Sequence, residues 1–190
     1  MRKRRAAKAV TLALLGLLLL KPVVARAQNY DRSKAASLVD AAIKMTNSDQ
    51  AVKLLWQATD IDPTFSDAYL YLGLYYNSRE DFAKVVEVYK RFVKYQPTGA
   101  TAVSAYLNIG EACMSFRPPK YDDALPYYRK AYEMDPGSAL AALRIGEIMA
   151  NQGNRAEAVR FLKQASSESG KDAAIADEAK KLLSQMGGPL

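Results

Sequence analysis

The chain has no histidine among its 190 residues, and it has a single cysteine. Histidine is the most frequent general base and the most frequent transition-metal ligand in proteins, so its absence disfavours acid–base catalysis and a metal centre. One cysteine cannot form an internal disulfide. A glycine-rich phosphate-binding motif is also absent from the sequence. From these absences we expect no enzyme activity, no cofactor and no metal.

The other groups that could carry chemistry have simpler structural interpretations. Cys113 stands at a position where the pattern described below buries an apolar residue, which favours a core side chain over a reactive nucleophile. The acidic pairs Glu80-Asp81 and Asp122-Asp123 stand beside the starts of predicted helices. Carboxylates stabilise that end of a helix, so we do not interpret these pairs as catalytic acids.

The net charge of +7 is concentrated at the start of the chain. Seven of the 27 basic side chains lie within residues 1–27, together with none of the 20 acidic ones, so the remaining residues carry 20 of each sign. A neutral remainder gives no electrostatic reason to expect a nucleic-acid partner. We therefore expect no nucleic acid binding.

Residues 1–27 have the pattern of a secretory signal peptide. A basic start is followed by the apolar run Ala9–Leu20 and by small residues at Ala25 and Ala27, which predicts cleavage after Ala27. The alternative is an uncleaved membrane anchor, but a helix of this run would span about 18 Å, against about 30 Å for a bilayer core. We expect a bacterial protein, periplasmic or secreted, with no membrane attachment after cleavage.

The stretch DAYLYLGLYY, Asp67 to Tyr76, contains four tyrosines and could be mistaken for a strand. Its largest apolar residues fall instead at helical spacing, and the same spacing recurs twice later in the chain. Each copy contains a glycine, which would cost about 1 kcal/mol inside a helix, so the recurrence predicts close helix–helix approach there. The three copies are Tyr69, Leu72, Gly73 and Tyr76; Tyr106, Ile109, Gly110 and Cys113; and Ala142, Ile145, Gly146 and Met149.

Prolines and apolar residues repeat with a step of 34 residues, which is the mark of a solenoid. Pro63 and Pro97 are separated by that step, whereas Pro97 and Pro136 are 39 apart. We place the additional residues in two connections, with sequences TGATAV and FRPPKY, because loops tolerate insertions at little cost. Residue pairs that keep the 34-residue step include Ala51 and Val85, Leu55 and Tyr89, Ala58 and Phe92, Ala124 and Ala158, Tyr128 and Leu162, and Ala131 and Ala165.

This pattern resembles the tetratricopeptide repeat family, whose first helix carries an aromatic, a leucine-glycine pair and a tyrosine, and whose second helix ends near a proline. The clearest match is formed by Tyr69, Leu72, Gly73, Tyr76, Val85, Tyr89, Phe92 and Pro97. The resemblance implies an all-α, right-handed α-solenoid within residues 28–190. We expect repeats at about 32–65, 66–99, 103–138 and 139–170, followed by a capping helix at 172–186 with Ile175, Ala179, Leu182 and Met186 on its apolar side.

In this family the first helices line a concave groove that commonly holds a peptide or a partner helix. The family's lysine- and asparagine-based clamp for a terminal carboxylate is not recognisable, because leucines occupy the expected lysine positions. We expect Tyr69 and Tyr76 in the core and Tyr71 exposed in the groove, while Tyr75 cannot be placed. Carried onto this chain, the groove residues are Leu70, Tyr71, Leu74, Asn77, Leu107, Asn108, Glu111, Leu143, Arg144 and Glu147.

The expected function is a non-catalytic scaffold or adaptor for protein–protein interaction in the periplasm. The junction at residues 88–113 is similar to repeats of bacterial cell-envelope proteins, so the partner is expected to belong to envelope assembly, secretion or pilus assembly. The alternative is a self-associating or membrane-retained structural element whose groove is filled by a second copy or by the chain's own N-terminal segment.

Overall fold

The structure, a computed structural model, describes residues 30–46, 48–167 and 172–187. The predicted signal peptide and its cleavage site lie outside these residues. All regular structure in the described ranges is α-helical. Its elements are α2 (Arg32–Ile43), α3 (Ser48–Ile61), α4 (Ser66–Asn77), α5 (Phe82–Tyr95), α6 (Ala100–Ser115), α7 (Tyr121–Met134), α8 (Ala139–Asn151), α9 (Arg155–Ser167) and α10 (Ala173–Gln185).

Short polar side chains begin several of these helices. The Asp31 carboxylate accepts a hydrogen bond from the Lys34 N–H at the start of α2, over 2.9 Å, and Asp81 accepts one from Lys84 at the start of α5, over 3.1 Å. Such caps satisfy backbone donors that the first helical turn leaves unpaired. The acidic residue of the Glu80-Asp81 pair that touches the helix therefore has a structural role.

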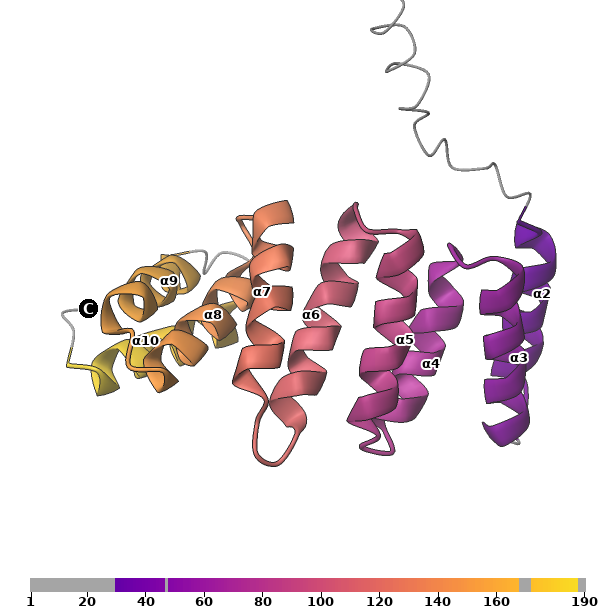
Figure 1. The fold of residues 1–190 in the computed structure, drawn as a ribbon, viewed down its shortest axis with the longest axis horizontal. Helices are drawn as coiled ribbons and strands as arrows, with labels where there is room; N and C mark the ends of the chain where they lie inside the picture. The colour runs from indigo at the N-terminus through magenta and orange to yellow at the C-terminus, as the bar shows by residue number, and fades with distance from the viewer. Residues whose placement is uncertain (1–29, 47, 168–171, 188–190) are drawn as a thin grey trace, which may run out of the picture. The chain divides into compact units, whose positions relative to one another are not determined.

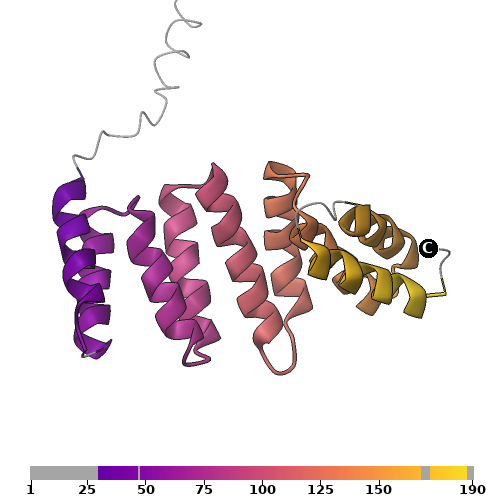
Figure 2. The same ribbon diagram turned by 180° about the vertical axis from the view of Figure 1, so that it is seen from behind.

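The helices form consecutive antiparallel pairs, and each helix packs against the next one along the chain (Figure 1). Contacts also join α2 to α4, which are the first helices of the first two units, and α8 to α10. Seen from behind, α10 lies alongside α8 and α9 (Figure 2). The described residues thus form a stack of four helix pairs closed by α10, as expected of an α-solenoid.

The three repeated glycines are confirmed as points of close helix approach. A Cβ atom at Gly73 would lie 2.3 Å from the Tyr89 hydroxyl, and one at Gly110 would lie 2.6 Å from the Tyr128 ring. At Gly146 the added atom would lie 2.7 Å from Cγ of Leu162. Each glycine therefore lets the second helix of its own unit approach, which explains why the sequence keeps it despite its poor helix propensity.

The third unit begins earlier than the sequence predicts. We expected its additional residues in a loop and its start at 103, but α6 begins at Ala100. Gly99 precedes it with φ of 93°, a conformation that glycine adopts without strain. The inserted residues therefore lengthen α6 at its start. By contrast, the FRPPKY insertion does fall in the connection between α6 and α7.

The buried face of α10 is also displaced from the predicted one. Ala176, Ala179 and Leu183 are its most buried residues, whereas Ile175, Leu182 and Met186 are only half-buried against the core. Because α10 contacts both α8 and α9, its buried surface is wider than a single row of apolar side chains. None of the described helices is long and apolar enough to cross a membrane.

Candidate functional site

Three large apolar side chains stand exposed on one side of α4. Leu70 is 48% exposed, Tyr71 is 38% exposed and Leu74 is 56% exposed. Residues four apart on a helix lie above one another, so Leu70 and Leu74 form one row with Tyr71 beside it. We call these three residues the α4 patch. A cluster of apolar side chains that the protein leaves in water marks a candidate interaction surface.

A cavity of about 300 Å³ lies beside this patch, between α4 and α6. Leu70 of the patch and Asn108 of α6 both line it, so the structure brings together two of the predicted groove residues. Its aromatic lining comes from the core residues Tyr69, Tyr89 and Phe92, and its polar lining includes Ser66, Asp67, Thr101 and Ser104. An apolar site with a few polar groups is typical of a surface that binds a peptide side chain.

A second cavity, of about 540 Å³, continues this surface toward the fourth unit. It lies between α6 and the junction of α7 with α8, and Leu107 of the predicted groove lines it together with Met134. Ser104 lines both cavities, so they are neighbours along α6. A ligand segment lying across α6 can therefore contact both.

The polar side chains of α6 retain acceptor capacity. The Ser104 hydroxyl donates to the carbonyl of Ala100 over 3.4 Å, and the Asn108 amide donates to the carbonyl of Ser104 over 2.9 Å. Their oxygen lone pairs accept no hydrogen bond from the described residues. These oxygens can receive N–H groups of an incoming peptide.

The predicted residues of the C-terminal half belong instead to an ion-pair network. Nε of Arg144 donates to Oε1 of Glu111 over 2.8 Å, and its Nη1 donates to Glu147 over 3.1 Å and to Glu178 over 3.2 Å. The Tyr128 hydroxyl donates to the same Oε1 of Glu111 over 2.7 Å. Burial and the Glu111 charge raise the pKa of Tyr128 above the ordinary tyrosine value. The network joins α6, α7, α8 and α10.

Leu143 is not part of the accessible surface, contrary to our expectation. Its side chain is 0% exposed, in the helix that packs against α10. The same repeat position is therefore open at Leu70, half-buried at Leu107 and closed at Leu143. The predicted groove is divided into an open apolar part at α4 and α6 and a part that holds α10.

The four tyrosines of α4 separate into different roles. Tyr69 is 1% exposed, with its ring centroid 5.2 Å from that of Phe92, and Tyr76 is half-buried and accepts a hydrogen bond from Trp56. These core placements and the exposure of Tyr71 agree with expectation. Tyr75, which the sequence could not place, donates its hydroxyl to Asp49 over 3.0 Å and thereby links α4 to α3.

Sequence reasoning missed several residues of this surface. Thr101 comes from the first turn added to α6, which we had interpreted as a loop. Glu178 pairs with Arg144 across 34 residues, and no local pattern reports such a contact. The helical period could have found Ser104, because it lies one turn before Asn108.

The described residues offer no cluster of three or more histidine, cysteine or acidic side chains that could hold a metal ion. Cys113 is buried, as predicted for a core residue, and burial raises the pKa of its thiol. A thiol in that state is a weak nucleophile at neutral pH.

The helix pairs, their glycine contacts and the exposed first-helix surface define an α-solenoid of the kind that binds peptides or proteins. Residues 120–183 match the family described as tetratricopeptide repeat. The same kind of helix pair recurs before residue 120, so this match supports a tetratricopeptide repeat protein.

Known proteins are similar to this chain in sequence or in fold. Tetratricopeptide repeat protein 21A of Mus musculus is 27% identical over 146 residues, which cover 76% of this chain. The chain spans only 11% of that protein's length. A crystal structure of MamA, 22% identical, superposes with a TM-score of 0.59 over 80% of this chain and 85% of its own. YrrB, described as a TPR protein with an unusual peptide-binding site, is 17% identical with a TM-score of 0.60, over 86% of this chain and 83% of its own.

Proposed function

We propose that the protein is a non-catalytic scaffold that holds an apolar peptide segment or helix of a partner protein against the α4 patch and the two cavities along α6. The exposed α4 patch is the observation that carries this proposal. Leu70 of the patch lines a cavity that also has aromatic and polar lining residues. An apolar anchor residue of the partner would therefore gain burial there, and its backbone would gain hydrogen-bond partners.

The similar fold of YrrB, which is described as a TPR protein with a peptide-binding site, supports this proposal. We further propose that the protein acts in the periplasm and that the partner belongs to envelope assembly, secretion or pilus assembly. The support for this location is the basic start, apolar run and small residues of residues 1–27. The ion-pair network restricts the binding segment to the open half of the surface, because α10 occupies the other half.

A self-associating structural element is the second candidate function. Ile43 and Met45, at the end of α2, are exposed by 50% and 41%, so apolar surface is not confined to the α4 patch. A second copy could cover such surface. A molecular mass that rises with protein concentration would favour this candidate.

The test is capture of partners from a cell-envelope extract by the full chain, followed by capture with Tyr71→Ala and Leu74→Ala combined. The matched control combines Tyr95→Ala with Ile43→Ala, because these residues are 39% and 50% exposed and lie outside the patch. We expect the patch variant to lose the partner and to keep its helical content, while the control retains the partner. Equal capture by all three proteins would place recognition elsewhere.

A further inference from the structure

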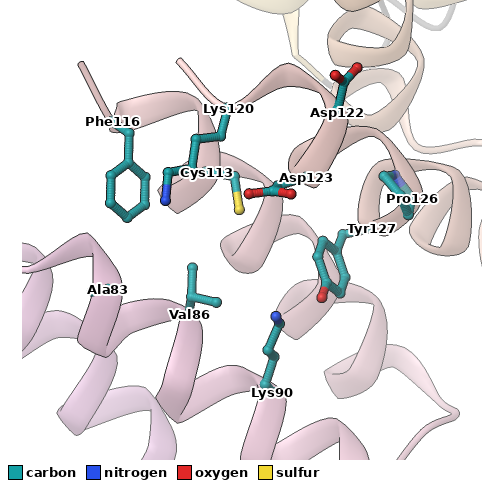
Figure 3. Close-up of a pocket in the computed structure, with 10 residues that line it drawn as sticks. All are labelled: Ala83, Val86, Lys90, Cys113, Phe116, Lys120, Asp122, Asp123, Pro126 and Tyr127. Carbon is teal, nitrogen blue, oxygen red and sulfur yellow. The ribbon is translucent and has the colours of Figure 1, made fainter. Parts of the chain in front are cut away.

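A recess of about 430 Å³ lies between α5, the end of α6 and the start of α7 (Figure 3). Its apolar lining includes Val86, Phe116 and Cys113. None of its lining residues lines the two cavities along α6 or belongs to the α4 patch. The recess is thus a second surface, formed mainly by second helices of the repeats.

Two lysine ammonium groups face this recess without a carboxylate partner. Nζ of Lys120 lies 3.9 Å from the centroid of the Phe116 ring, and Nζ of Lys90 lies 5.5 Å from that of Tyr127 (Figure 3). Neither ammonium has a carboxylate oxygen within 4.0 Å among the residues that the structure describes. The Phe116 ring holds Lys120 in place, and Lys90 interacts with the side chain of Tyr127, whose hydroxyl accepts a hydrogen bond that raises the pKa of Lys90. An ammonium group has three N–H donors, so both lysines keep donors for an anion.

One lysine of α5 and one of α7 pair with acidic residues instead. Lys84 of α5 pairs with Glu87 over 2.7 Å, and Lys130 of α7 pairs with Glu133 over 3.2 Å. Both pairs lie one helical turn apart, which is the ordinary arrangement on a solvated helix face. Lys94 of α5 also has no such pair among the described residues, and its Nζ lies 5.8 Å from the centroid of the Tyr95 ring, so Lys90 and Lys120 are distinguished by lining the same recess.

The acidic residues of the recess do not cancel both cations. The Asp122 carboxylate accepts a hydrogen bond from the Gln152 amide over 2.9 Å and points away from the recess (Figure 3). Asp123 faces inward, so the side chains directed into the recess carry two positive charges and one negative charge. This balance attracts an anion and leaves Asp123 as an acceptor for a neighbouring N–H group.

We propose that the recess binds an acidic peptide segment of a partner protein, with a carboxylate between Lys90 and Lys120 and an adjacent apolar side chain on Val86 and Phe116. The apolar side chain removes water from the ammonium groups, which strengthens their attraction for the carboxylate. Asp123 accepts a backbone N–H of the same segment. This site is separate from the α4 patch, so it does not depend on the function proposed above.

The test is an NMR titration of the isotope-labelled full chain with three short synthetic peptides. They are acetyl-Leu-Glu-Leu-amide, the same peptide with Gln in place of Glu, and acetyl-Leu-Leu with a free C-terminal carboxylate. The first two differ only in the charge of the central side chain, and the third supplies the carboxylate from a chain end. The protein variants are Lys90→Gln with Lys120→Gln, and a control of equal charge, Lys94→Gln with Lys130→Gln.

We expect saturable shifts of backbone signals lining the recess with the Glu peptide, and at least tenfold weaker binding of the Gln peptide. The recess variant should lose this preference, and the control variant should keep it. Tighter binding of the third peptide would also support the proposal and would assign the carboxylate to a chain end. The proposal is overturned if Glu and Gln peptides bind equally, if the recess variant keeps the preference, or if no peptide carboxylate gives saturable recess shifts up to millimolar concentration.

Discussion

Replacing Gly146 with alanine tests the packing that holds each repeat together. A methyl group there would lie 2.7 Å from Cγ and 2.9 Å from Cδ2 of Leu162, and 3.2 Å from the Leu162 backbone nitrogen. Carbon atoms pack well at about 3.5 to 4.0 Å, so α9 must move away from α8. Overpacking of this kind costs about 1 to 3 kcal/mol, whereas alanine gains about 1 kcal/mol in helix propensity. The difference is a net loss of about 0 to 2 kcal/mol, and we expect the upper half of that range because a backbone atom of Leu162 is involved.

The measurement is urea denaturation of the full chain, followed by far-UV circular dichroism. The control is Gly137→Ala, where the added atom would lie 3.4 Å from the Asp135 carboxylate in ordinary contact. This control should be neutral or stabilising by up to about 1 kcal/mol, because alanine restricts the unfolded chain. If Gly146→Ala stabilised the protein by the propensity difference alone, the close-approach explanation for the repeated glycines would be refuted.

Three further predictions concern buried polar groups. Arg144→Ala should lower the free energy of unfolding by about 2 kcal/mol in the same urea assay, because the carboxylates of Glu111 and Glu147 lose the cation that they share. Arg144→Lys should restore only part of this loss. Tyr69→Phe should be neutral or stabilising in thermal unfolding at neutral pH, because the buried Tyr69 hydroxyl has no hydrogen-bond partner among the described residues; a marked loss of stability would contradict that reading. Burial raises the pKa of Tyr69 from 10.0 to about 12, so the unfolded chain loses this proton first, and the free energy of unfolding should decline as the pH rises from 10 toward 12. Urea denaturation across this range should show the decline, and Tyr69→Phe should reduce it.

The repeat architecture could be predicted from the sequence because the same short pattern of residues occurs in several repeats. Gly73, Gly110 and Gly146 each stand in the same short pattern, and each one contacts the second helix of its own unit. Short-range packing of this kind leaves a periodic signal in the sequence. For the same reason, the exposure of Tyr71 and the burial of Tyr69 follow from the helical period.

The limits of prediction lie where contacts between distant segments decide the outcome. Leu143 occupies the same repeat position as Leu70, but it is buried in a helix that packs against α10, and no pattern around residue 143 indicates this burial. The pairing of Arg144 with Glu178 likewise depends on how the last helix packs. The early start of α6 was missed because the sequence TGATAV combines turn-forming and helix-forming residues, and only the conformation of Gly99 shows where the helix begins.

The central claim is that the α4 patch holds a partner protein. Its most direct test is the affinity of the recovered partner for the full chain, measured by calorimetry with the patch variant (Tyr71→Ala with Leu74→Ala) and the control variant (Tyr95→Ala with Ile43→Ala). A buried tyrosine anchor contributes about 2 kcal/mol, so we predict at least a tenfold loss of affinity for the patch variant and no change for the control. Equal affinities of both variants and the unmodified chain would contradict the claim.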